Sequence, residues 1–237
     1  MTATVISSEV VVWGDTTSAP PVYSLTIPSD CTAAYVCSSY YINTSSYELV
    51  SLTLNSLSAD EQEVELGTIL SSAHGIYAFY NPATGSQDLD IQFIGTPDEG
   101  PASCIVIYVK DGDVAAWRDS DSAHTAGTAA NSVTLTTVSD DLVVKFDTRY
   151  HVSTPPGLSG SWTNIATESV GNTCCRASYI VATGSTEVCD SENESESSIV
   201  AIAIQPAVTG PVITDVNGTE SWTDGDTGLV ITGTGFV

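Results

Sequence analysis

Basic residues are scarce in this chain of 237 residues, which carries 5 Lys and Arg against 29 Asp and Glu and has a formal net charge of −24. A surface of this kind repels phosphate backbones and anionic lipids, so the composition argues against nucleic acids and membranes as partners. The first residues also lack the basic start and apolar stretch of a secretory leader, and no apolar run is long enough for a membrane span, so we expect neither. The acidity favours solubility and attracts cations.

The residue patterns of common enzyme sites are missing as well. The chain has three histidines, His74, His124 and His151, and it contains no H-E-x-x-H pair, glycine-rich phosphate loop or dinucleotide fingerprint. The stretch GLSGSW at 157–162 misses the G-x-S-x-G elbow of serine hydrolases by one position. Because serine and aspartate are abundant, a Ser-His-Asp trio can be chosen almost anywhere and carries little weight. We therefore expect a protein that is not an enzyme.

None of the cysteines forms a C-x-x-C pair, which leaves a zinc ribbon or a thioredoxin-type redox site without support. Cys31 and Cys37 are six residues apart, which places both on one face of a strand, and Cys104 lies in an apolar run. We expect the cysteines to be small buried thiols. One or two disulfides that join the Cys174–Cys175 region and Cys189 are the open alternative.

Helical periodicity with caps is also lacking, and short runs of period two or of continuous apolar residues take its place. Turn residues such as Asn81-Pro82 and Pro155-Pro156-Gly157 separate these runs. The runs expected to be strands are 10–13, 23–27, 31–42, 50–54, 76–80, 89–93, 104–109, 133–135, 142–146, 177–182 and 199–204. About a dozen short strands at this spacing predict an all-β antiparallel sandwich.

Some details of this pattern are more specific. Runs 104–109 and 199–204 are apolar on both faces, which is typical of central strands that are covered on both sides. The runs that contain Val133 and Leu142 predict a hairpin across Ser139-Asp140. Residues 59–70 fit a short helix, and a strand over 63–66 competes with it. The acidic stretch DSENESESS at 190–198 is too polar for a core and predicts a solvated hairpin loop before the last strand.

Four stretches carry a resemblance to a known module: YAFYNPATGSQDLDIQFIGTP at 77–97, CIVIYVKDGD at 104–113, NSVTLTTVSDDLVVKFDTRY at 131–150 and SSIVAIAIQPA at 197–207. In this order they resemble a jelly-roll module of tailed-phage virion proteins and of some bacterial surface proteins. The resemblance implies an antiparallel jelly-roll β-sandwich over residues 20–207, with residues 1–19 as an N-terminal strand or arm. It also implies adhesion, display or assembly and no chemistry.

The last residues resemble the start of a different domain. After the linker PAVTGP at 206–211, ITDV at 213–216 and GLVITGTGF at 228–236 are similar to the first two strands of an IPT/TIG immunoglobulin-like domain. We expect residues 208–237 to begin such a domain as an Ig-like strand pair. Two strands alone leave unpaired edges in water, so either the chain continues beyond Val237 or another subunit supplies the missing strands.

One loop offers a candidate metal site. The stretch KDGDVAAWRDSDSAH at 110–124 carries Asp111, Asp113, Asp119 and Asp121, which converge if its two D-x-D arms fold back on each other. Carboxylate and carbonyl oxygens suit Ca²⁺, which takes about six to eight of them. The spacing is not that of an EF-hand, and Arg118 is placed to neutralise one carboxylate instead. Calcium is thus the one candidate cofactor, and aspartates that simply face water are the competing interpretation.

Binding is the function that these patterns and resemblances favour. We expect an accessory structural protein of a tailed virus, such as a capsid decoration, turret or fibre subunit, located in the virion and assembled in the host cytoplasm. Its expected partners are a major capsid or tail protein and its own copies, most simply as a trimer. A tail or baseplate appendage is an alternative. A hydrolytic tail enzyme would need two carboxylates at catalytic separation.

A glycan-binding adhesion module is the remaining alternative, with a host-surface glycan as partner. Aromatic side chains that form a sugar-stacking platform would carry it, and core or subunit-interface packing is their competing role. The candidates for this platform are Trp117, Trp162, Trp222, Tyr40, Tyr41 and Tyr150.

Overall fold

The structure is a computed structural model that describes residues 2–13, 22–41, 48–66, 72–94, 102–127, 129–150, 154, 156–158, 160–170, 173–191 and 196–207. Within these ranges the chain forms sixteen β-strands and no helix. Every strand pairing is antiparallel. The all-β antiparallel sandwich expected from the sequence is confirmed.

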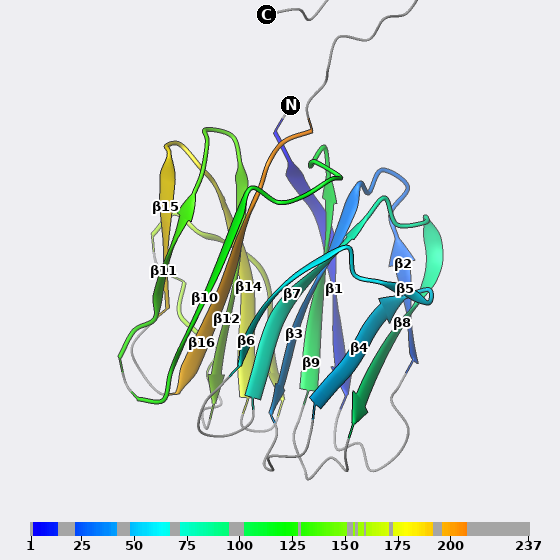
Figure 1. Cartoon of the computed structure of the whole chain (residues 1–237), viewed down its shortest axis with the longest axis horizontal. Helices are drawn as coiled ribbons and strands as arrows, with labels where there is room; N and C mark the ends of the chain where they lie inside the picture. The colour runs from blue at the N-terminus through cyan, green and yellow to red at the C-terminus, as the bar shows by residue number, and fades with distance from the viewer. Residues whose placement is uncertain are drawn as a thin grey trace, which may run out of the picture.

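The strands form four sheets that stack as four layers (Figure 1). Outer sheet 1 has the order β2 (Val22–Ile27), β8 (Gly85–Ile94), β4 (Glu48–Leu54), β5 (Leu57–Ser58). Inner sheet 1 has the order β1 (Thr4–Trp13), β9 (Ala102–Lys110), β3 (Ala33–Tyr41), β7 (Ser72–Tyr80), β6 (Glu61–Leu66). Inner sheet 2 has the order β10 (Asp119–Thr125), β16 (Ser197–Ile204), β12 (Leu142–Tyr150), β14 (Thr173–Val181), β13 (Thr163–Val170). Outer sheet 2 consists of β11 (Ser132–Thr136) and β15 (Thr186–Asp190).

Three hydrophobic clusters fill the gaps between the layers. The first joins outer sheet 1 to inner sheet 1, the second joins the two inner sheets, and the third joins inner sheet 2 to outer sheet 2. Both faces of each inner sheet therefore have a covering layer, which favours central strands that are apolar on both sides. The doubly apolar runs 104–109 and 199–204 lie in β9 and β16 and are buried at every position, so the prediction of two central strands is confirmed.

The strand order of the first two layers is that of a jelly roll. β1 pairs with β9, β2 with β8, β3 with β7 and β4 with β5, so the chain forms one long nested hairpin wrapped around a core. β6 is added beside β7 at the edge of inner sheet 1. We call this sandwich, residues 4–110, unit 1.

The last two layers repeat this order with fewer strands. β10 pairs with β16, β11 with β15 and β12 with β14, and β13 is added beside β14. We call this sandwich, residues 119–204, unit 2. The described residues between β12 and β13 contain no counterpart of β4 and β5. Unit 2 is thus a reduced second copy of the same nested hairpin.

Two turns repeat in sequence as well as in place. The tetrapeptide Ala-Thr-Gly-Ser recurs at 83–86 and at 182–185, where it connects β7 to β8 and β14 to β15. The dipeptide Ser-Asp recurs at 29–30 and at 139–140, inside turns in which Cys31 N donates to Pro28 O and Asp141 N donates to Val138 O. Sequence and strand order therefore agree on an internal repeat.

The two units pack inner sheet against inner sheet in a symmetric way. β1 contacts β13, and its counterpart β10 contacts β6; likewise β9 contacts β13 and its counterpart β16 contacts β6. β9 and β16 finish at the same end of the stack, where Gly112 and Pro206 form an antiparallel bridge. An approximate twofold relation along the strands therefore exchanges the two units.

Two expectations about neighbouring strands are wrong. β11 and β12 form no hairpin across Ser139-Asp140, because β11 pairs with β15 whereas β12 pairs with β14 and β16 in another layer. β15 and β16 also lie in different sheets, so 190–198 is not a hairpin loop, and Ser197 and Ser198 are buried at the start of β16. The physical reason is the jelly-roll path, in which the nested hairpin folds over its core and successive strands cross between facing sheets.

The alternative left open over 59–70 is decided for its described part, where β6 is a strand at the edge of inner sheet 1. Residues 67–71 and the Ig-like strand pair at 208–237 lie outside the described residues. The boundary expected after residue 19 also falls in an undescribed range, and β1 before it belongs to inner sheet 1. The division into 1–19, 20–207 and 208–237 stays a prediction, and the two-unit arrangement is an addition to it.

Candidate functional site

Asp111 and Asp113, the first two candidate calcium ligands, lie in the turn that follows β9. Their backbones pair with the segment after β16: Asp113 N donates to Gln205 O at 2.8 Å, and Ala207 N donates to Asp111 O at 2.7 Å. The Asp113 carboxylate accepts a hydrogen bond from Ala115 N at 3.0 Å. These two aspartates shape the junction between the units.

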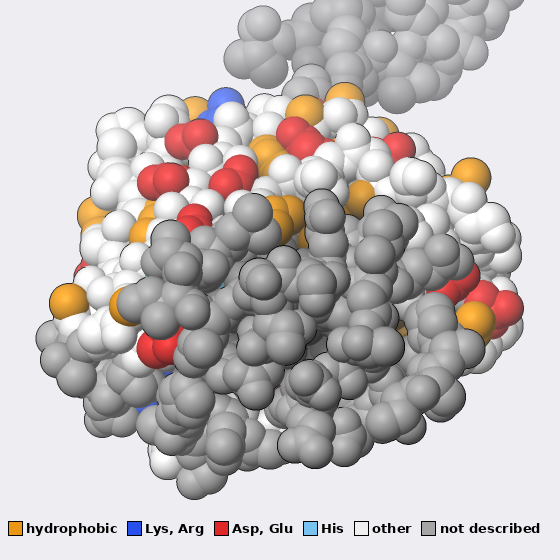
Figure 2. Space-filling model, turned by 60° about the horizontal axis from the view of Figure 1, so that its bottom comes forward, with side chains coloured by type: hydrophobic (Ala, Val, Ile, Leu, Met, Phe, Trp, Pro, Cys, Tyr) orange, Lys and Arg blue, Asp and Glu red, His pale blue; other side chains and the backbone are white. Residues whose placement is uncertain are grey.

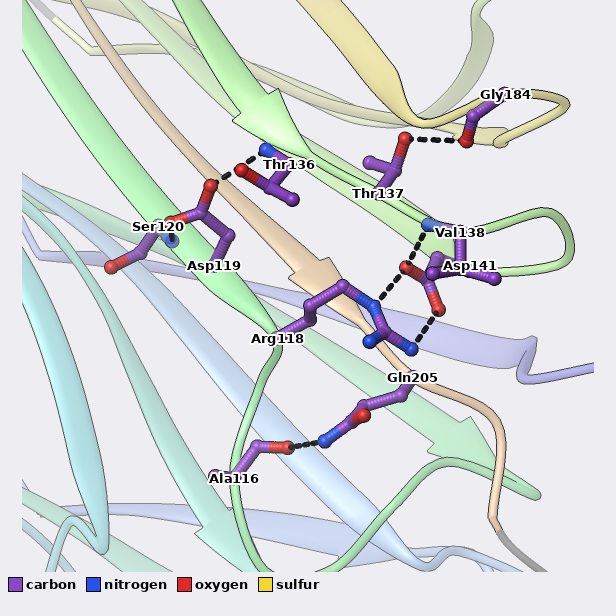
Figure 3. A network of polar contacts seen from close by, with 10 residues as sticks. All are labelled: Ala116, Arg118, Asp119, Ser120, Thr136, Thr137, Val138, Asp141, Gly184 and Gln205. Carbon is purple, nitrogen blue, oxygen red and sulfur yellow. Dashed lines mark hydrogen bonds and ion pairs between the residues drawn. The ribbon is translucent and has the colours of Figure 1, made fainter.

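Asp119 and Asp121, the other two candidates, lie on β10. Asp119 Oδ2 accepts a hydrogen bond from Thr136 N of β11 at 2.6 Å (Figure 3), and Asp121 Oδ1 accepts one from Ser122 N at 2.9 Å. Among the residues that the structure describes, no group of three or more His, Cys, Asp or Glu side chains is arranged to hold a metal ion. The four aspartates are not brought together, so the geometry adds no support to the calcium site, which stays a prediction from the sequence.

Arg118, considered above as a partner for one of these four carboxylates, pairs with Asp141 instead. Its Nε and Nη2 donate to the two carboxylate oxygens at 2.6 and 3.2 Å (Figure 3), and Val138 N donates to the same carboxylate at 2.8 Å. Asp141 is fully buried, and the bidentate ion pair and the turn hydrogen bond provide its carboxylate oxygens with donors. This network ties the start of β10 to the turn between β11 and β12.

A charged cluster that the sequence analysis missed lies on the outward face of inner sheet 2. Lys145 and Asp147 are two residues apart on β12 and therefore share one face, and both side chains are 1% exposed. Lys145 Nζ lies 3.1 Å from Asp147 Oδ2, donates to Asp190 O at 2.7 Å and sits 4.8 Å from the centre of the Trp162 ring. Burial raises the pKa of Asp147 to about 6, while Lys145 and two neighbouring arginines act to lower it.

The equivalent face of unit 1 is apolar. There, Val36 of β3 and Phe79 of β7 pack against Leu52 of β4 in the first hydrophobic cluster. Unit 2 has no described counterpart of β4, and its face carries Lys145 and Asp147 where unit 1 buries aliphatic side chains. Both charged groups are buried, so neither is exposed to a substrate in solution.

A serine, a histidine and a glutamate meet at the start of β16. His124 Nδ1 lies 2.8 Å from Ser198 Oγ, and His124 Nε2 lies 3.7 Å from Glu196 Oε1. The contacts run from serine to histidine to carboxylate, as in a hydrolase triad. The serine of such a triad must be accessible to the substrate that it attacks. Ser198 is fully buried in a central strand, so this arrangement is an internal polar contact. No motif in the sequence indicates this trio.

His74 of β7 is fully buried as well. Its burial, with a smaller effect from His124, lowers the pKa of its imidazole from 6.5 to about 3. The folded chain therefore favours the neutral form of the His74 imidazole.

All six cysteines are buried free thiols, as expected, and the alternative disulfides are not formed. Burial raises the pKa of Cys31 to about 11 and of Cys175 and Cys189 to about 12. Since the thiolate is the reactive species, we expect no reaction with Ellman's reagent in the native protein and reaction of all six thiols after unfolding in guanidinium. A native disulfide would leave fewer than six thiols to titrate.

Trp117 and Trp162 lie on opposite faces of inner sheet 2 and share no platform. Trp117 belongs to the cluster between the inner sheets and is 8% exposed, whereas Trp162 packs against the cluster between inner sheet 2 and outer sheet 2. Trp222 and the side chains of Tyr40, Tyr41 and Tyr150 lie outside the described residues. Core packing, the competing interpretation, applies to Trp117.

A groove opens at one end of unit 1, between the β4–β5 turn and the β7–β8 connection. Its volume is about 210 Å³. Leu54 and Phe79 are buried lining residues, and Leu57 and Pro82 contribute further apolar lining. Tyr80 also lines the groove, but its ring packs against the cluster between the inner sheets. We call it the β4–β5 groove; its polar lining residues are Asn55, Ser58, Asp60, Asn81 and Gln87. It combines an apolar interior with several carboxamides, and the sequence analysis did not find it.

In the described part of the chain, no helix has the length and apolar character needed to cross a membrane. Comparison of the chain with protein-family models, with curated proteins and with solved structures gives no match. The jelly-roll strand order is therefore known from the pairing of the strands, and the resemblances to phage virion modules and to IPT/TIG domains stay predictions.

Proposed function

We propose that the protein is an accessory structural protein of a tailed-virus particle, such as a capsid decoration, turret or fibre subunit, and that it acts by binding and assembly. The observation that carries the proposal is the four-layer stack of two jelly-roll units, whose inner sheets are covered on both faces. Such a stack supplies a rigid body with large outer surfaces, which suits a subunit that holds neighbours in place.

The surface charge supports a binding partner of opposite sign. Lys145 and Arg149 are buried, and the more exposed Lys110 and Arg118 lie 3.8 and 2.6 Å from the carboxylates of Asp30 and Asp141. Figure 2 shows acidic side chains at many separate points of one face and few basic ones. A basic patch on a major capsid or tail protein is therefore the complementary surface that we propose, with its own copies, most simply a trimer, as further neighbours.

Labelling of purified particles tests this proposal. An antibody against the chain is expected to bind at regular positions on the particle head in electron micrographs. Label confined to the tail would support a tail or baseplate appendage instead. Particles without label, prepared from a lysate that contains the protein, would contradict a place in the virion.

A glycan-binding module is the second candidate function. Trp117 and Trp162, two of the aromatic residues on which it first rested, do not meet, but the β4–β5 groove offers apolar and carboxamide groups side by side. Binding of a free sugar by the purified protein would support this function whether or not the protein belongs to a virion.

A further inference from the structure

We propose that the β4–β5 groove binds one neutral sugar ring. The groove has an apolar part that suits this ligand. Leu54 and Phe79 are 4% and 3% exposed and belong to the hydrophobic cluster of unit 1, and Leu57 and Pro82 line the groove with them. One face of a pyranose ring carries mainly C–H groups, which pack against apolar and aromatic side chains of this kind.

The polar part of the site consists of carboxamides. Asn55 belongs to the β4–β5 turn, Asn81 to the β7–β8 connection and Gln87 to β8. A carboxamide both donates and accepts hydrogen bonds, as a sugar hydroxyl does. Within the part of the chain that the structure describes, no hydrogen bond occupies these three side-chain amides.

The groove is preformed. Asn55 N donates to Asp88 O at 2.7 Å, and Asn81 N donates to Thr32 O at 2.8 Å, so both turns are anchored to neighbouring strands. Tyr80 N donates to Asp60 Oδ2 at 2.7 Å, which fixes the wall between them. Asn55 and Asn81 hold left-handed backbone conformations, with φ of 50° and 48°. Fixed walls lower the entropy that a small ligand loses on binding.

The volume of the groove and the charge of its lining restrict the class of ligand further. The volume of about 210 Å³ is below the range of about 300–1,000 Å³ that drug-sized ligands occupy, so the groove suits one ring. The carboxylate of Asp60 lines the groove. This carboxylate repels uronic and sialic acids, so a neutral sugar is the ligand that we expect.

Titration of the full chain with neutral methyl glycosides, followed by protein amide NMR, tests the proposal. The probes are the methyl glycosides of glucose, galactose, mannose and N-acetylglucosamine. At least one of them is expected to give saturable shifts at groove residues, with a dissociation constant of about 1 mM. Gln87→Leu is expected to weaken this binding by about tenfold, because it removes a hydrogen-bonding amide at nearly constant volume. Asn81→Gly removes another amide and accepts the left-handed backbone, so the same loss is expected.

Gln62→Leu is the matched control, because Gln62 is an exposed glutamine of β6 that does not line the groove. Its affinity is expected to equal that of the unaltered chain. The proposal is overturned if no neutral glycoside shifts the groove amides, if both groove variants bind as tightly as the control, or if a glucuronide or sialoside binds more tightly than the neutral sugars. None of these outcomes depends on whether the protein lies in a virus particle, so this inference and the proposed function fail separately.

Discussion

Replacement of Lys145 by methionine is expected to lower the free energy of unfolding by about 3–5 kcal/mol at about pH 7. The variant leaves the carboxylate of Asp147, which is 1% exposed, without the ammonium group that lies 3.1 Å away. Removal of one partner of a buried pair costs more than removal of both, because the remaining charge stays out of water and loses its strongest compensating group, with only the weaker effects of Arg176 and Arg149 left. Denaturant unfolding of the full chain measures the loss.

Two further variants separate this cause from a general loss of packing. Lys145→Met combined with Asp147→Leu is expected to recover most of the stability, since an apolar pair of similar volume needs no compensating charge. Lys110→Met is the matched control, because Lys110 and Asp30 form an exposed pair 3.8 Å apart, and it is expected to cost less than about 1 kcal/mol. Equal losses for Lys145→Met and Lys110→Met would contradict the buried-pair explanation.

The loss in Lys145→Met is also expected to shrink as the pH falls. Burial raises the pKa of Asp147 from 3.8 to about 6, so between these values the folded chain binds more protons at this site than the unfolded chain. The contribution of Asp147 to the free energy of unfolding therefore rises as the pH falls through this range. In Lys145→Met the carboxylate is still harder to ionise, so this variant gains more stability from protonation than the unaltered chain does.

His74→Gln is expected to remove a large part of the loss of stability in acid. The folded chain holds the pKa of His74 at about 3, against an ordinary value of 6.5, because the imidazole is buried. Between these values the unfolded chain binds the proton and the folded chain does not, so stability from this site is full above about pH 6.5 and falls as the pH decreases. At about pH 5 the difference amounts to about 2 kcal/mol, and in stronger acid to about 5 kcal/mol. Glutamine retains polar atoms and does not titrate.

The measurement is the free energy of unfolding at about pH 7 and about pH 5, compared between His74→Gln and the unaltered chain. Ser39→Ala is the control, since Ser39 pairs with His74 across β3 and β7 and is buried but does not titrate in this range. It is expected to shift stability equally at both pH values. A pH slope in His74→Gln equal to that of the unaltered chain would show that His74 does not protonate on unfolding in this window.

Single strands were predictable from the sequence, and their neighbours were not. The alternation of Val133 and Leu135 with polar residues reports that one face of β11 is buried. It does not report which sheet covers that face. The hairpin prediction used nearness in the chain, whereas β11 pairs with β15, about 50 residues away. Long-range partners depend on the jelly-roll path of the whole chain.

The internal repeat was present in the sequence and was not recognised there. Ala-Thr-Gly-Ser at 83–86 and at 182–185 is an exact repeat, but four residues are a weak signal without the strand order on both sides. The buried charges of unit 2 had a signal too, because Val143, Lys145 and Asp147 share one face of a strand by period two. Lysine and aspartate lie mostly at protein surfaces, so the period of two alone does not predict that these two are buried.

The candidate sites divide in the same way. Acidic side chains such as Asp113 and Asp119 are visible in the sequence, but their hydrogen bonds to backbone N–H groups of the local turn and of β11 are decided by the fold. The β4–β5 groove is assembled from three segments, and none of them contains a motif. Sites of this kind form where separate segments of the chain come together, so no local sequence pattern predicts them.

What the amino-acid sequence determined by itself is the all-β class, the positions of most strands, the two doubly buried central strands and the acidic character of the surface. These follow from composition and from a period of two, which each segment carries on its own. Only the tertiary structure decided that two nested hairpins stack inner sheet to inner sheet, that Lys145 and Asp147 are buried as a pair, and that the groove forms at one end of unit 1. The physical reason is that an apolar face of a strand shows only that another layer must pack against it. Which layer packs there depends on all the other apolar faces that the chain must bury at the same time.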